Sequence, residues 1–134
     1  MRKLMAAFCV LAGLSVGMWA DAKQVLSSTA QRETKMYVYT LVAAEAEMMA
    51  KGLTPEQTKI MQEHLDHLKS LSDKGLVVIA GRTLNNDETT FGIVMLRADS
   101  DAAAGEIMSR DPGIRKGLFR ATLFPFLITA QESH

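Results

Sequence analysis

The hydrophobic and polar positions of the chain change their period several times between residues 35 and 130. Residues 35–43 (KMYVYTLVA) are rich in Tyr, Val, Leu and Thr, which is typical of a β-strand. Residues 76–81 (LVVIAG), 89–98 (TTFGIVMLRA) and 118–130 have the same character. Between the first two of these segments, apolar residues recur with the spacing of one long amphipathic helix. The pattern therefore predicts four strands and a long helix.

The long helix is expected to begin near Thr54 and to continue to about Lys74. Thr54 can cap the helix, Pro55 suits its first position, and Gln57 can complete a capping box. Gly75 is expected to end it, because glycine readily adopts the left-handed conformation found after a helix.

Shorter helical segments are expected elsewhere. Residues 44–53 form a connection that can contain a helical turn. A second helix is expected after Ser100, which can cap it, and Asp111–Pro112–Gly113 should break this helix. The resulting order, β-α-β-β-α-β, is the ferredoxin-like arrangement. We therefore predict an α+β fold in which two helices cover one face of a four-stranded antiparallel sheet.

The strands do not alternate apolar and polar residues, as a sheet with one solvated face should. In residues 91–96 (FGIVML) both alternating sets are apolar, and in the last strand Phe124 and Phe126 share one face while Leu123 and Leu127 share the other. Two helices cannot cover both faces, so the second face needs a partner. An identical sheet is the simplest candidate, and we expect a homodimer whose sheets pack face to face, a dimeric α+β barrel.

The start of the chain is typical of a secretory signal peptide. Arg2 and Lys3 make a short basic start, residues 4–19 are an almost unbroken apolar run, and residues 20–22 (ADA) place small residues at a cleavage site. The apolar run is shorter than the roughly 20 residues of a membrane span, although an uncleaved anchor is the alternative. We expect cleavage after residue 22, a flexible lead at residues 23–34 and one domain at residues 35–131. The protein would then be periplasmic or secreted, without membrane attachment.

Charge and cysteine content narrow the classes of function. The chain has 15 basic and 15 acidic residues, so nothing electrostatic favours nucleic acid or an anionic membrane as a partner. Its one cysteine, Cys9, lies in the predicted signal peptide. The exported domain therefore has no disulfide, thiol nucleophile or thiolate metal ligand. No glycine-rich phosphate loop occurs, and we expect no cofactor.

His64 is the residue most informative about function. At about 100° per residue it lies within the apolar stripe of the long helix, between Leu71 and Leu68. Burial disfavours a charged imidazole unless an acid pairs with it, so His64 is either a hydrogen-bonded core residue or the centre of a site. His67 lies just off the stripe, and we expect it to be solvated. The two histidines could share a metal ion, but no signature completes a ligand set, and we expect no metal site.

Three further residues are candidates for binding a substrate. Arg82 ends an apolar strand and could hold a substrate carboxylate through two hydrogen bonds, the alternative being an exposed strand end. Tyr37 and Tyr39 share one strand face and could line a cavity or donate a phenolic hydrogen bond. Packing in the core or at a dimer interface is the alternative for both tyrosines.

Several of these residues lie in motifs that resemble the YciI-like (YCII-related) family. The motifs are His64–Leu65–x–x–Leu68, Ala80–Gly81, Phe91–Gly92–Ile93–Val94 and Arg110–Asp111–Pro112, which follow one another within residues 35–131. The resemblance implies a ferredoxin-like dimeric α+β barrel. It also implies an active site built from a helix histidine and the aspartate of an Asp–Pro turn, here His64 and Asp111. Most members have no assigned reaction, and a dehydrochlorinating enzyme of aromatic degradation is among the few with known chemistry.

A His–Asp pair is well suited to proton transfer. The carboxylate accepts from one ring nitrogen and fixes the tautomer, and the other nitrogen can exchange a proton with a ligand near neutral pH. We therefore predict general acid–base chemistry on a small molecule, with His64 as the acid or base and Asp111 as its orienting partner. The alternatives are a non-catalytic binding or accessory domain that uses the same pocket, and a structural dimer in which His64 is a core residue.

Overall fold

The computed structural model describes residues 34–132. The predicted signal peptide and nearly all of the predicted lead lie outside these residues, and both stay predictions. The elements in chain order are β1 (Lys35–Ala43), α2 (Glu47–Lys51), α3 (Pro55–Asp73), β2 (Val77–Arg82), β3 (Gly92–Ala98), α4 (Asp101–Ser109), α5 (Pro112–Arg115) and β4 (Phe119–Phe126). None of the helices between residues 34 and 132 is long and apolar enough to cross a membrane.

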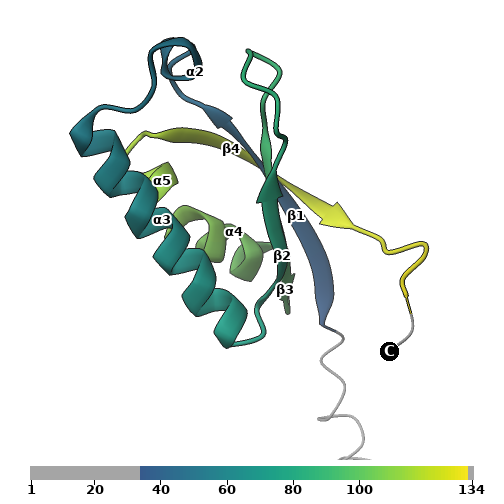
Figure 1. Cartoon of the computed structure of the whole chain (residues 1–134). Helices are drawn as coiled ribbons and strands as arrows, with labels where there is room; N and C mark the ends of the chain where they lie inside the picture. Colours follow the sequence, from purple (N-terminus) through teal and green to yellow (C-terminus); the bar gives the residue numbers. More distant parts are fainter. Residues whose placement is uncertain (1–33, 133–134) are drawn as a thin grey trace, which may run out of the picture. The chain divides into compact units, whose positions relative to one another are not determined.

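The strands form one antiparallel sheet in the order β2-β3-β1-β4. Strand β3 therefore lies between β1 and β2, which are joined by a crossover through α3. Helices α3, α4 and α5 lie on the same face of the twisted sheet (Figure 1). The predicted α+β, ferredoxin-like fold is confirmed.

The core lies between this face and the helices, because every second side chain of a strand points to the same side. The buried residues of the two central strands are Tyr37, Tyr39 and Leu41 in β1 and Val94, Leu96 and Ala98 in β3. Residues Leu71 of α3 and Ala104 of α4 pack against them. Burial of these side chains is the main source of stability available to a sheet and helices of this size.

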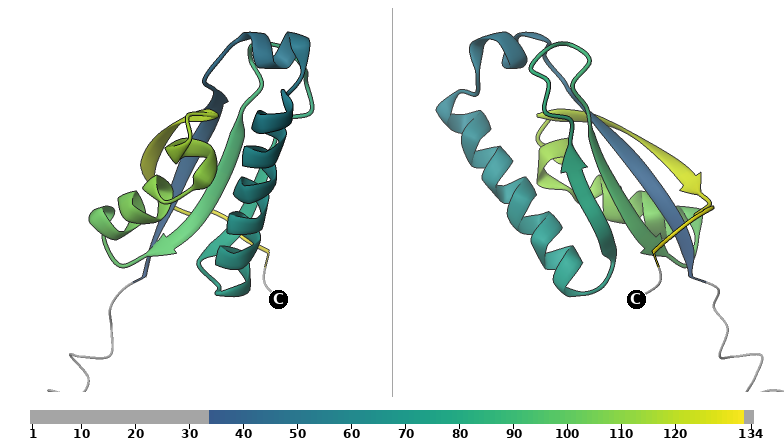
Figure 2. Two further views of the ribbon diagram at one scale, coloured as in Figure 1. Left: turned by 90° about the vertical axis from the view of Figure 1, so that its left-hand side faces the viewer. Right: turned by 45° about the vertical axis from the view of Figure 1, so that its right-hand side comes forward.

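The other face of the sheet, which we call the open face, carries an apolar row across all four strands. Ile79 pairs with Met95, Met95 with Val38, and Val38 with Phe124. The side chains at the two ends of the row are the most exposed, Ile79 at 56 % and Phe124 at 47 %. No helix of residues 34–132 covers this row (Figure 2).

Helix α3 begins and ends as its sequence predicts. The Thr54 side chain accepts a hydrogen bond from the Gln57 backbone, and the Gln57 side chain accepts one from the Thr54 backbone. Gly75 follows the helix with φ of 72°, a left-handed conformation that a glycine adopts without strain. Between these ends, His64 and Leu71 are the buried residues of the helix.

Two predicted strands are shorter in the structure. Strand β3 begins at Gly92 rather than near residue 89, because Asp87 accepts hydrogen bonds from the Thr89 backbone and the Asn85 side chain and closes a turn there. Strand β4 ends at Phe126, where it pairs with Met36 near the beginning of β1. The β1–β4 ladder ends at this pair, so residues 127–130 lie beyond it.

Candidate functional site

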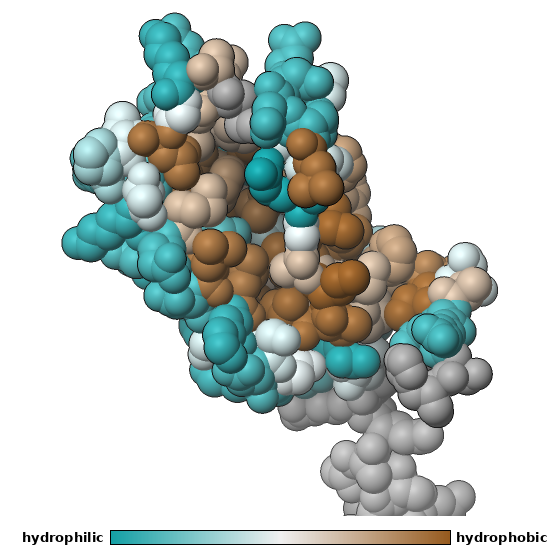
Figure 3. Space-filling model, in the orientation of Figure 1, coloured by the Kyte–Doolittle hydropathy of each residue, from teal (hydrophilic) through white to brown (hydrophobic). Residues whose placement is uncertain are grey.

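A cavity of about 820 Å³ lies between α3 and the sheet. Its volume is in the range of small-molecule binding sites. Apolar side chains form most of the wall, among them Leu41, Met48, Met61, Leu65, Leu68 and Phe119. Figure 3 shows the hollow beside α3, with apolar residues around it. Segment α2 and the β2–β3 connection lie at the same end of the described domain (Figure 2), and residues of both line the cavity.

His64 lines this cavity and contacts Asp111 behind it. The His64 Nδ1 atom lies 2.7 Å from Oδ1 and 2.9 Å from Oδ2 of Asp111. His64 is 5 % exposed and Asp111 is fully buried. A buried carboxylate is costly unless it is paired and hydrogen-bonded. The structure therefore brings together the two residues that the sequence singled out for proton transfer, which are 47 positions apart in the chain.

The Asp–Pro–Gly sequence sets the position of the carboxylate. Asp111 is extended, as expected before a proline, and Pro112 begins the short helix α5. The Asp111 Oδ1 atom accepts a hydrogen bond of 2.8 Å from the Gly113 backbone N–H, so the same carboxylate caps α5 and contacts His64. An ion pair between Lys116 and Glu63 also joins the end of α5 to α3.

Tyr39 is the third partner of the carboxylate. Its hydroxyl donates a hydrogen bond of 3.1 Å to Asp111 Oδ2, and its side chain is fully buried. Burial raises the pKa of the Tyr39 phenol, and the charge of Asp111 and the hydrogen bond to it raise that pKa further. Tyr39 therefore stays protonated and remains a donor at neutral pH. It supports the site from behind rather than lining the cavity.

Tyr37 is not part of this site. Its hydroxyl donates a hydrogen bond of 2.6 Å to Asp101 Oδ1, at the beginning of α4. This hydrogen bond, with burial and the charge of Asp101, raises the pKa of Tyr37 to about 12. Tyr37 and Tyr39 point to the same side of β1, but two positions along a strand separate them by about 7 Å. Each tyrosine therefore meets a different aspartate.

Phe119 and Gly113 are site residues that the sequence analysis missed. The Phe119 ring contacts the His64 ring edge-on, with centroids 5.2 Å apart. A Cβ atom at Gly113 would lie 2.8 Å from Phe119 Cδ2 and 3.2 Å from Asp111 Oδ1. Phe119 thus packs directly over a position that has room only for glycine. The sequence signal for Gly113 is its place in the Asp–Pro–Gly turn, which by itself indicates only a helix break.

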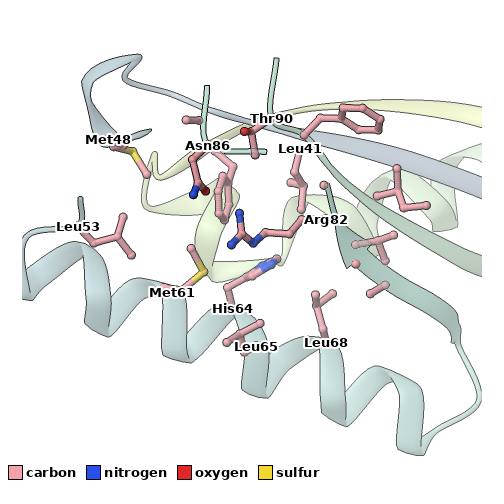
Figure 4. A pocket seen from close by; sticks show the side chains of 18 of the residues that line it. Leu41, Met48, Leu53, Met61, His64, Leu65, Leu68, Arg82, Asn86 and Thr90 are labelled. Atoms are coloured by element: carbon pink, nitrogen blue, oxygen red, sulfur yellow. The ribbon is translucent and has the colours of Figure 1, made fainter. Parts of the chain in front are cut away.

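Arg82 ends β2 and lines the cavity. Figure 4 shows its guanidinium group between Asn86 and His64. Its one hydrogen bond within residues 34–132 is a long one, 3.5 Å from Nη1 to the Thr83 carbonyl oxygen. The guanidinium group has no carboxylate partner in this part of the chain.

His67 is half-buried rather than solvated, which corrects our expectation from the sequence. Its Nε2 atom is buried and has no hydrogen-bond partner among the described residues. Burial lowers the pKa of His67, and coulombic interactions with His64 and Lys74 lower it further, while the charge of Asp111 acts in the opposite direction. Within the described part of the chain, no three His, Cys, Asp or Glu side chains lie close enough together to hold a metal ion.

Comparison with solved structures found similar proteins. The chain is similar to 5-chloro-2-hydroxyhydroquinone dehydrochlorinase from Burkholderia phenoliruptrix, solved in complex with 2,5-dihydroxybenzoquinone, with 16 % identity and a TM-score of 0.52. That match covers 69 % of this chain and 93 % of the other. An uncharacterised protein from Thermotoga maritima matches with 17 % identity and a TM-score of 0.46, over 71 % of this chain and 100 % of the other. No curated protein sequence matches the chain.

Comparison of the sequence with models of protein families identifies the family. The model of the YCII-related domain matches residues 36–126. This segment runs from the second residue of β1 to the last residue of β4 and includes His64, Arg82 and Asp111. The chain belongs to the YCII-related family.

Proposed function

We propose that the protein binds a small molecule in the cavity and that His64 transfers a proton to or from it. The observation that carries this proposal is the buried contact between His64 Nδ1 and Asp111, at the wall of an apolar cavity of ligand size. A buried carboxylate with two further donors, placed beside a histidine that lines a cavity, is an arrangement typical of functional sites.

The partners of Asp111 define the role of each ring nitrogen. Its two oxygens accept hydrogen bonds from the Gly113 N–H and the Tyr39 hydroxyl, so an ionised carboxylate fits the position, and His64 Nδ1 is the donor to it. A neutral imidazole with its proton on Nδ1 has an unprotonated Nε2. That atom has no protein partner among residues 34–132 and is available to a molecule in the cavity.

The proton-transfer step follows from this arrangement. Nε2 takes a proton from the bound molecule, and the resulting imidazolium is stabilised by its charge-assisted hydrogen bond to Asp111. The same nitrogen returns the proton at a second position or to water. Isomerisation and elimination both need a base of this kind. The dehydrochlorinase from Burkholderia has the same fold and was solved with a small ring compound, so the fold is compatible with such a ligand.

The test is exchange of carbon-bound hydrogen for deuterium. A panel of small carboxylic acids, ketones and phenols is incubated with the protein in D₂O, and loss of C–H signals is followed by ¹H NMR. We expect exchange in at least one compound, and His64→Asn should abolish it while the circular dichroism spectrum stays the same. Tyr37→Phe is the matched control, because the Tyr37 hydroxyl contacts Asp101 outside the cavity. Exchange that persists in His64→Asn would refute the proposal, and binding without exchange would favour the non-catalytic alternative.

We also propose that the open face is covered by the same face of a second copy. The row formed by Ile79, Met95, Val38 and Phe124 is apolar across the whole width of the sheet. Contiguous exposed apolar surface of this kind is typical of an interface, and identical faces can pair about a two-fold axis.

A further inference from the structure

The ionisable side chains of residues 34–132 that line the cavity are basic. Arg82 is a permanent cation there, and His64 can become one. No aspartate or glutamate of residues 34–132 lines the cavity, since Asp111 lies behind His64 rather than in the wall. Among the described residues, the cavity therefore offers a cationic group to a ligand and no anionic one.

The Arg82 guanidinium group has hydrogen-bond donors available to a ligand. It has five N–H donors, and the contact to the Thr83 carbonyl uses one of them at 3.5 Å. Arg82 pairs across the sheet with Gly92, so no side chain of β3 stands beside it at this position. The guanidinium group points toward His64 (Figure 4). An arginine beside a titratable group in a shared cavity is placed to hold one end of a ligand while the other group reacts.

The rest of the wall limits the body of such a ligand. Leucine, methionine and phenylalanine side chains line the rest of the cavity, including Met61 and Leu65 of α3 and Phe91. Asn86 is the neutral polar neighbour of the guanidinium group, and its amide can donate to a second oxygen atom (Figure 4). A planar guanidinium group binds the two oxygens of a carboxylate through two parallel hydrogen bonds.

We infer that the ligand of this cavity is a compact, mainly apolar carboxylic acid, whose ionised carboxylate is held by Arg82 and whose apolar body lies against α3, near His64. This inference rests on the proposal that the cavity is the functional site. It adds the chemical class of the ligand and makes Arg82 the residue that determines this specificity.

The test compares acids with their neutral isosteres. Benzoate and cyclohexanecarboxylate are titrated into ¹⁵N-labelled protein, beside benzamide and cyclohexanecarboxamide, and the backbone signals of Gly81 and Gly92 are followed by NMR. We expect each acid to bind on the order of tenfold more tightly than its amide, the difference that charge-assisted hydrogen bonds give. Arg82→Gln should remove most of this preference while the amides bind as before.

Arg97→Gln is the matched control. Arg97 is another exposed arginine of the sheet, on β3, but it does not line the cavity, and its guanidinium group contacts the Gly75 carbonyl oxygen. This variant should keep the full preference for acids. Equal binding of acid and amide, no binding of any of the four probes, or an unchanged preference in Arg82→Gln would each overturn the inference.

The two proposals fail in different ways. If His64-dependent deuterium exchange is found but acids are not preferred, proton transfer stands and the ligand class is wrong. If acids bind through Arg82 but His64→Asn leaves all exchange unchanged, the ligand class stands and the role of His64 is wrong.

Discussion

Replacing Gly113 by alanine tests whether close packing holds the His64–Asp111 pair in place. Gly113 is buried in α5, donates its backbone N–H to Asp111 and lies beneath the Phe119 ring. An added Cβ would be 2.8 Å from Phe119 Cδ2 and 3.1 Å from Cε2. These distances are too short for carbon atoms in contact, so either the ring or α5 must move.

The expected cost follows from two opposing effects. Overpacking a close-packed core usually costs about 1 to 3 kcal/mol. Alanine stabilises a helix over glycine by up to about 1 kcal/mol, but α5 is only one turn long, so this gain is small here. We therefore expect Gly113→Ala to lower the free energy of unfolding by about 1 to 3 kcal/mol. A loss of this size lowers the Tm of such a domain by several degrees. Because Phe119 also contacts His64, the His64 ring should shift as well.

The assay is urea unfolding, with imidazole NMR signals as a second readout. Gly105→Ala is the matched control, because Gly105 is in α4 and a Cβ there would meet nothing within 4 Å. That variant should be as stable as the wild type or more stable, by up to about 1 kcal/mol. Its His64 signals should not change.

The double variant Gly113→Ala with Phe119→Leu separates the clash from other effects. The smaller Leu side chain gives room to the added methyl group, so the two changes together should cost less than the sum of each alone. A stable Gly113→Ala variant with unchanged His64 signals would refute the reasoning. So would strict additivity in the double variant.

Three further predictions follow from the same structure. Asp111→Asn should lower the free energy of unfolding by about 1 to 3 kcal/mol, because it changes a buried hydrogen-bond partner of His64. It should also alter the ¹⁵N signals of the His64 ring, whereas Asp101→Asn should leave these signals unchanged. Burial lowers the pKa of His67 in the folded state, so the unfolded chain binds more protons just below pH about 6.5, and the free energy of unfolding should fall as the pH decreases through that range. His67→Gln should reduce this fall when urea unfolding is compared at two pH values. An unchanged fall would contradict the reasoning. Met95→Lys, in the middle of the open face, should convert the expected homodimer to a monomer in analytical ultracentrifugation, and a wild type that is already monomeric at micromolar concentration would refute the dimer.

The sequence determined the local structure of this protein. Helix α3 could be placed from Thr54, Gln57 and Gly75, since capping and helix termination depend on a few neighbouring residues. The alternation of Tyr37 and Tyr39 along β1 gave their shared face in the same way. The sequence also showed that His64 lies on the buried stripe of its helix, because the period of a helix fixes which residues share a face.

The tertiary structure determines which side chains these residues contact. Asp111 became the partner of His64 only because α5 packs against α3, and nothing in the local pattern at either position encodes that contact; family resemblance supplied it. Tyr37 and Tyr39 have the same pattern, yet one contacts Asp101 and the other Asp111, because different helices lie over them. The burial of His67 and the packing of Phe119 on Gly113 were likewise invisible in the sequence. The period of a helix or strand shows which side of the element a residue occupies. Its neighbour on that side depends on how elements distant in the sequence pack together, which is a property of the whole fold.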